Sequence, residues 1–154
     1  MTKPVNYLPE GYSAVMPYLV LNGAAAAIDF YRQVFSAVEI MRLSQPGSDL
    51  VGHAEIRIGN SVIMLADEHP GMIFRGPKSL GGVSITLVIY VPDCDAVMQQ
   101  ALAAGAKELR PVQDQFYGAR SGTIEDPFGH VWTISTHKED VSPEEMARRA
   151  AALG

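Results

Sequence analysis

The feature that most constrains the fold is a short hairpin pattern that occurs twice in the chain. The clearer copy turns at residues 126–129 (Asp-Pro-Phe-Gly), where Pro fixes φ and Gly is free to take a positive φ. The weaker copy turns at Gly59-Asn60, between the strand-like runs 52–58 and 61–67. Two similar hairpins in a chain of 154 residues indicate an internal duplication.

Each half of the chain has the pattern of a strand, a helix and three further strands. Residues 19–23 (Leu-Val-Leu-Asn-Gly), before the first helical pattern, match residues 89–93 (Ile-Tyr-Val-Pro-Asp), before the second. A single half would leave one face of its sheet uncovered, so we expect the halves to pair, as repeats do generally. The sequence therefore predicts an α+β fold of two βαβββ modules.

Polar residues mark where the helices are expected to begin. Asn22 is the predicted N-cap of the first helix, and Asp93 that of the second. Ser142, followed by Pro143 and Glu145, forms a capping-box pattern that predicts a short C-terminal helix on the surface or at an interface.

The sequence predicts five segments along the chain. The stretch between the modules is rich in Gly and Pro, which is typical of a linker and would also suit a flexible lid. The segments are an N-terminal arm (1–13), a first module (14–69), the linker (70–82), a second module (83–137) and a C-terminal helical segment (138–154).

Composition excludes several classes of partner. The formal net charge of −5 argues against nucleic acid and anionic membranes as general partners. The longest strongly apolar run, residues 85–91, is too short to span a bilayer, and residues 1–7 lack the apolar core of a signal peptide. The single Cys94 rules out an internal disulfide and a multi-cysteine zinc site. We expect a cytoplasmic protein.

Several short motifs in a fixed order carry a family resemblance over residues 14–146. They are Met16-Pro17-Tyr18-Leu19, Ile28-Asp29-Phe30-Tyr31, residues 53–59 (His-Ala-Glu-Ile-Arg-Ile-Gly), residues 126–132 (Asp-Pro-Phe-Gly-His-Val-Trp) and Thr136-His137. With these, the chain resembles the vicinal oxygen chelate superfamily of glyoxalases, bleomycin-resistance proteins and dioxygenases, and more narrowly its PhnB-like branch. The resemblance implies that the two βαβββ modules form an open curved sheet around a pocket. It also implies a homodimer.

Metallated members of this superfamily hold a divalent ion in that pocket. The positions that match their ligands are Met16, Met64, Thr86 and Thr133. Hard divalent ions prefer carboxylates and imidazoles, whereas thioethers suit soft ions and neutral hydroxyls bind weakly. We therefore expect no metal at the family location and no other cofactor, while a divalent metal held by other residues stays open.

His53 and Glu55 are two residues apart on a predicted strand and so share one face. They would serve as a base and its orienting acid, or as metal ligands outside the family pattern. The alternative is a hydrogen-bonded pair on the strand surface. A second polar group, His69 with Asp67 and Glu68, is either a metal site or a solvated loop.

The leading interpretation is a protein that binds a small, partly aromatic or amphipathic molecule, as bleomycin-resistance-like proteins do. Arg120 would pair with a ligand anion or form a salt bridge, and Trp132 would stack on a ligand or pack in the core. The predicted ligand-binding residues are Met16, Tyr18, Met64, Thr86, Tyr90, Arg120, Trp132 and Thr133. One alternative is a metal-dependent glyoxalase-like lyase, isomerase or dioxygenase centred on His53 and Glu55. Another is a protein-interaction role for the C-terminal helix.

Overall fold

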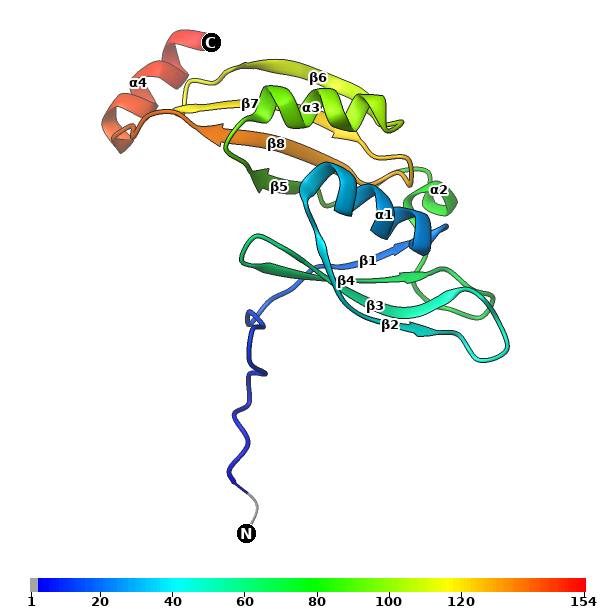
Figure 1. The fold of residues 1–154 in the computed structure, drawn as a ribbon. Helices are drawn as coiled ribbons and strands as arrows, with labels where there is room; N and C mark the ends of the chain where they lie inside the picture. Colours follow the sequence, from blue (N-terminus) through cyan, green and yellow to red (C-terminus); the bar gives the residue numbers. More distant parts are fainter. Residues whose placement is uncertain (1–2) are drawn as a thin grey trace. The chain divides into compact units, whose positions relative to one another are not determined.

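The computed structural model describes residues 3–154, and the chain divides into two compact units between Leu80 and Gly81 (Figure 1). The first unit contains β1 (Tyr18–Leu21), α1 (Ala24–Phe35), β2 (Val38–Ser44), β3 (Val51–Ile58), β4 (Ser61–Asp67) and α2 (Pro77–Leu80). The second contains β5 (Leu87–Tyr90), α3 (Cys94–Ala103), β6 (Lys107–Asp114), β7 (Ala119–Glu125), β8 (Val131–His137) and α4 (Pro143–Leu153). The predicted α+β class, the repeated βαβββ order and the short C-terminal helix are confirmed.

The two units have the same sheet topology. The strand order is β1-β4-β3-β2 in the first sheet and β5-β8-β7-β6 in the second, and both sheets are open. β1 runs parallel to its neighbour β4, and β5 runs parallel to its neighbour β8. The other neighbouring pairs are antiparallel. The predicted hairpins turn with Gly59 at φ +57° and Gly129 at φ +97°, a region that favours glycine.

In the first unit, α1 lies along one face of the sheet (Figure 1). The helix buries one apolar stripe, which includes Ile28 and Tyr31, both fully buried. The sheet meets it with alternate side chains such as Ala54, Ile56 and Leu65. α1 contacts β2, β3 and β4, and α2 contacts β1.

The start of α1 corrects the prediction that Asn22 is its N-cap. The N-cap is Gly23, at φ +90°, and no side chain of its own caps the helix. Instead the buried carboxylate of Asp67, at the end of β4, accepts the backbone N–H groups of Gly23 and Ala24, both at 2.8 Å. Its second oxygen accepts the N–H of Val51, also at 2.8 Å. A residue distant in sequence thus satisfies donors that a helix start leaves free.

In the second unit, α3 packs on the sheet through Met98, Cys94 and Ala101, all buried. A Cβ at Gly122 on β7 would lie 2.5 Å from Met98 Cε, so glycine permits this close approach. The predicted cap of α3 is confirmed, since the Asp93 side chain accepts the N–H of Ala96.

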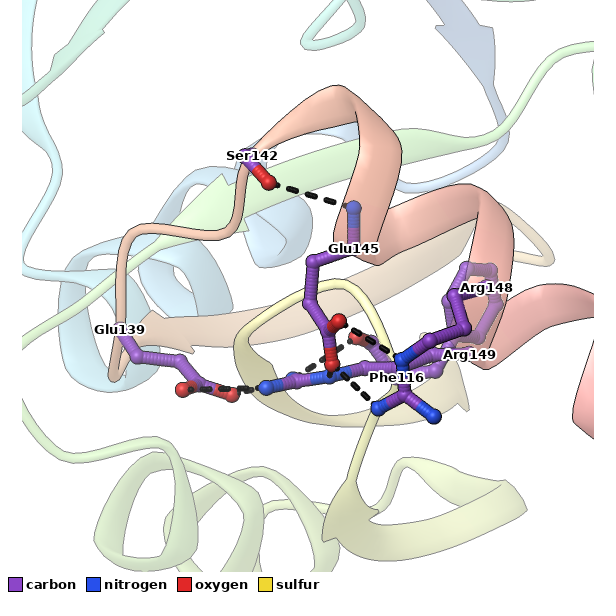
Figure 2. A network of polar contacts seen from close by, with 6 residues as sticks. All are labelled: Phe116, Glu139, Ser142, Glu145, Arg148 and Arg149. Atoms are coloured by element: carbon purple, nitrogen blue, oxygen red, sulfur yellow. Dashed lines mark hydrogen bonds and ion pairs between the residues drawn. The ribbon is translucent and has the colours of Figure 1, made fainter.

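The C-terminal helix α4 has no buried residue and is held by polar contacts (Figure 2). Ser142 is its N-cap as predicted, with Oγ accepting the N–H of Glu145 at 3.2 Å. The Glu145 carboxylate accepts hydrogen bonds from Arg148 and Arg149. Arg149 also donates to the backbone carbonyl of Phe116, at 3.2 Å. None of the helices among residues 3–154 has the length and apolar character needed to cross a bilayer.

Candidate functional site

The first sheet has one face towards α1 and one face opposite to it, called here its open face. Met64 on β4 pairs in register with Tyr18 on β1 and with Glu55 on β3. Directly paired residues point to the same side of a sheet, and successive residues alternate. Because the next residue, Leu65, belongs to the buried core against α1, the side chains of Tyr18, Met64 and Glu55 lie on the open face.

Four side chains on this face form a continuous chain of hydrogen bonds, called here the tyrosine–histidine cluster: Tyr12, Glu55, His53 and Tyr18. The Tyr12 hydroxyl donates to Glu55 Oε1. Glu55 Oε2 lies 2.8 Å from His53 Nε2, and His53 Nδ1 lies 2.8 Å from the Tyr18 hydroxyl. The predicted pairing of His53 with Glu55 is therefore present, and it is extended at both ends by tyrosines.

The charge of the cluster sits on Glu55, which is only 4% exposed. The hydrogen bond from His53, and then that from Tyr12, holds the pKa of Glu55 below its usual value, against the effect of burial. The pKa of Tyr12 is raised, mainly by its hydrogen bond to Glu55. Burial and the Glu55 charge raise the pKa of Tyr18. Both phenols therefore keep their protons, and they act as hydrogen-bond donors rather than as bases.

These proton positions fix what the cluster offers to a ligand. An ionised carboxylate only accepts, so His53 Nε2 carries a proton. The Nδ1 of the neutral ring then accepts the Tyr18 proton, and the Tyr18 oxygen presents lone pairs outward. Tyr18 is 47% exposed, so its hydroxyl is the polar group at the accessible end of the cluster.

Two predicted ligand-binding residues lie on the corresponding face of the second sheet, opposite to α3. Tyr90 on β5 pairs with Ser135, and Thr133 on β8 pairs with Thr123 on β7, where the two Oγ atoms are 3.1 Å apart. Thr86 is exposed and precedes β5. In the first unit, Met16 is half-buried just before β1.

Trp132 and Arg120 lie on the opposite side, towards α3. Trp132 is 2% exposed, and its Nε1 donates to Asp126 Oδ2 at 3.0 Å. Arg120 donates to both carboxylate oxygens of Asp95, at 2.8 and 3.0 Å, and to Asp114 at 3.2 Å. In the structure, therefore, Trp132 packs in the core and Arg120 forms a salt bridge, which are the alternatives to ligand binding named above. Their roles in ligand binding stay predictions without support from their placement.

The acidic group around His69 is divided among separate partners. Asp67 binds the start of α1, as described above. Glu68 accepts the N–H of Gly76 at 2.9 Å, and His69 Nδ1 binds the carbonyl of Pro70 at 3.0 Å. The three side chains therefore do not converge on one point.

Sequence reasoning missed Tyr12 and Thr123. Tyr12 belongs to the predicted N-terminal arm and reaches Glu55 across 43 residues of sequence, so no local spacing could reveal the contact. Thr123 could have been found, because the hairpin register places it opposite Thr133.

The fold defines the class of protein: α+β, with two βαβββ modules and two open sheets. Residues 14–134 match the family model of the Glyoxalase/Bleomycin resistance protein/Dioxygenase superfamily. The chain belongs to this superfamily.

Known proteins similar to this chain include a sequence relative and solved structures of the same fold. Uncharacterized protein Mb0911c of Mycobacterium bovis is 40% identical over 144 residues, which cover 92% of this chain and 94% of that protein. The crystal structure of TioX from Micromonospora sp. ML1 has a TM-score of 0.61 at 24% identity and covers 84% of this chain and 100% of its own. A PhnB protein from Bacillus cereus has a TM-score of 0.65 at 17% identity. The match covers 80% of this chain and 99% of that protein.

The residues that the family resemblance assigns to the metal position do not fit a divalent ion. Met16, Met64, Thr86 and Thr133 offer two thioethers and two neutral hydroxyls. Among residues 3–154, no group of three or more His, Cys, Asp or Glu side chains is arranged to hold a metal. Both nitrogens of His53 and both carboxylate oxygens of Glu55 are already hydrogen-bonded within the tyrosine–histidine cluster.

Proposed function

We propose that this protein binds a small, partly aromatic or amphipathic molecule on an open sheet face, without a divalent metal at the family location. The observation that carries the proposal is the tyrosine–histidine cluster beside Met64. It joins an accessible phenol, an imidazole and a thioether on the sheet face opposite to α1.

The chemistry of this surface suits a ligand with both apolar and polar parts. The Tyr18 and His53 rings lie 5.5 Å apart between centroids, tilted by 48°, and present edges and faces to a flat molecule. The flexible thioether of Met64, on the same face, adapts to irregular shapes. The Tyr18 hydroxyl supplies one directional hydrogen bond, which would orient the ligand.

An enzyme is the second candidate, and a specific contact favours it. The 2.8 Å contact between His53 and the buried Glu55 is the arrangement of a base and its orienting acid. A metal-dependent lyase, isomerase or dioxygenase would need ligands beyond this pair.

A ligand screen tests the proposal. Thermal denaturation would be followed in the presence of aromatic and amphipathic compounds, with and without chelator, and hits would be titrated. The change Tyr18→Phe removes the hydroxyl, and we expect about tenfold weaker binding, equal to about 1.4 kcal/mol. The matched control is Tyr7→Phe, since Tyr7 is 92% exposed and outside the cluster.

Two outcomes would contradict the proposal. One is the absence of any saturable binding across the screen. The other is turnover of a bound compound that depends on stoichiometric metal, measured by mass spectrometry after loading with Zn, Ni, Mn and Fe and lost in His53→Ala. The second outcome would establish the enzyme alternative.

Location and further partners are part of the proposal. We expect a cytoplasmic protein, since the single Cys94 fits a reducing compartment. Cell fractionation checks this expectation. The formal charge of −5 supports a small-molecule ligand over nucleic acid or an anionic membrane surface.

A further inference from the structure

Four hydroxyl side chains form a regular block in the centre of the second sheet, called here the hydroxyl grid: Ser121 and Thr123 on β7, and Thr133 and Ser135 on β8. The register pairs Ser121 with Ser135 and Thr123 with Thr133. Paired residues share a face, and residues two apart share it as well. The intervening Ile134 belongs to the core, so the grid lies on the face opposite to α3.

Two of these hydroxyls have no partner of their own. Ser121 is 3% exposed and Ser135 is 2% exposed, yet neither side chain forms a hydrogen bond within residues 3–154. No fully buried polar side-chain atom in the described chain lacks a partner, so these two oxygens reach the surface. Polar groups on nearly buried side chains normally find partners, and these two are positioned to bind a ligand.

The flanking strands give the grid a polar end and an apolar end. On β6, Arg110 pairs in register with Thr123 and Gln113 with Ser121. Arg110 is exposed and forms no ion pair among the described residues, unlike Arg120, which Asp95 engages.

The other end of the grid is apolar and aromatic. On β5, Val88 pairs with Thr133 and Tyr90 with Ser135. Both side chains are largely exposed, at 60% and 63%. The four strands thus carry, in order, apolar or aromatic groups, two columns of hydroxyls, and a cation beside an amide.

We propose that this face binds a small organic oxyanion, a carboxylate or phosphonate, joined to an aromatic or alkyl body. The oxyanion would lie between Arg110 and the hydroxyl grid, and the body would lie over Val88 and Tyr90. Guanidinium and hydroxyl donors both suit such an anion. Neighbouring strands are about 4.8 Å apart, so the distance from β5 to β6 is roughly 14 Å, the length of a molecule of about two rings. This inference rests on the proposed small-molecule binding and names the class of ligand.

The test compares acids with a neutral analogue of the same shape. The acids 4-biphenylacetate and 4-biphenylmethylphosphonate, with 4-biphenylacetamide as the neutral probe, would be titrated into the full chain and followed by backbone N–H chemical shifts. We expect saturable binding of the acids, shift changes centred on β7 and β8, and about tenfold weaker binding of the amide. Arg110→Gln should weaken binding of the acids by about tenfold and leave binding of the neutral amide unchanged. The control is Arg32→Gln, which changes an exposed arginine on α1 and should alter neither affinity.

A double variant tests the grid itself. The double variant Ser121→Ala, Ser135→Ala removes the two unpartnered hydroxyls with little change in side-chain size. We expect it to weaken binding of the acids several-fold. Equal affinity for acids and amide, or acid binding unchanged by Arg110→Gln, overturns the inference while the proposed small-molecule binding stands. If the acids do not bind at all while other compounds bind, the inference alone fails. If no compound binds, both fail.

Discussion

Glu55 is the residue whose ionisation the surrounding structure controls most directly. Its carboxylate is buried, and it accepts from both His53 and Tyr12, which lowers its pKa. A lowered pKa in the folded state means that folding is favoured by the ionised form. The resulting stability is complete above the ordinary glutamate pKa of 4.5 and is lost as the pH falls towards the lowered value.

The first prediction follows from this linkage. Glu55→Gln cannot ionise, so at neutral pH its free energy of unfolding should be lower than that of the wild type, by about 1 kcal/mol. The difference should shrink as the pH falls below 4.5. Urea denaturation of both proteins across the acidic range measures this. A difference that is constant with pH would contradict the assigned ionisation.

At the residue scale, the sequence predicts local relations and misses distant ones. His53 and Glu55 share a strand face because they are two residues apart, and this contact was predictable. The contact between Tyr12 and Glu55 depends on how the arm meets the sheet, which no spacing encodes. Arg120 left two alternatives open, since a guanidinium pairs equally well with a ligand anion or with Asp95.

At the scale of elements, α4 depends on one arginine. Arg149 joins the helix to Glu139 at 2.5 Å and to the carbonyl of Phe116 in the turn between β6 and β7 (Figure 2). Arg148, by contrast, bonds within residues 3–154 only to Glu145 in its own helix. Arg148 and Arg149 together lower the pKa of Glu145 to about 2. The two arginines are neighbours with different roles, which makes them a matched pair.

The second prediction compares these two arginines. Arg149→Ala should release α4 from the turn and increase hydrogen exchange across Pro143–Leu153 several-fold, with no change in the sheet. Arg148→Ala removes only contacts within the helix and should have a smaller effect. Hydrogen exchange read by mass spectrometry checks both variants, and equal effects would show that Arg149 does not anchor the helix.

Helix starts show which part of an element can be predicted. Asp93 and Ser142 cap their own helices through bonds to residues three positions on, and the sequence predicted both. The start of α1 is different, because Asp67 reaches it from another strand. Asn22 had the right chemistry but was not used, since Gly23 in a left-handed conformation already turns the chain.

At the scale of the whole molecule, the sequence predicted the fold because a repeated pattern restricts topology. Two hairpins in matching places required two similar modules, and the sheets have the same strand order. The ligand could not be predicted in this way, since one fold hosts many chemistries. Assembly likewise stays a prediction, drawn from the family resemblance.

The third prediction is that the protein is a homodimer. Apolar side chains on the edge strand β2 are exposed, with Val38 at 59% and Leu43 at 55%, and an edge strand of this kind favours association. Light scattering should give twice the chain mass of 16.6 kDa. The mass of one chain at every concentration would contradict the prediction.

The separation of the two sheets along the sequence has a consequence for biosynthesis. Every strand pairing of the first sheet lies between Tyr18 and Asp67, and every pairing of the second lies between Leu87 and His137. A ribosome needs several seconds for the roughly 70 residues after Leu80, at about 5–20 residues per second, whereas hairpins form within about 10 μs. The first sheet therefore has time to form before the second is translated, and neither half depends on strands from the other to complete its backbone hydrogen bonds.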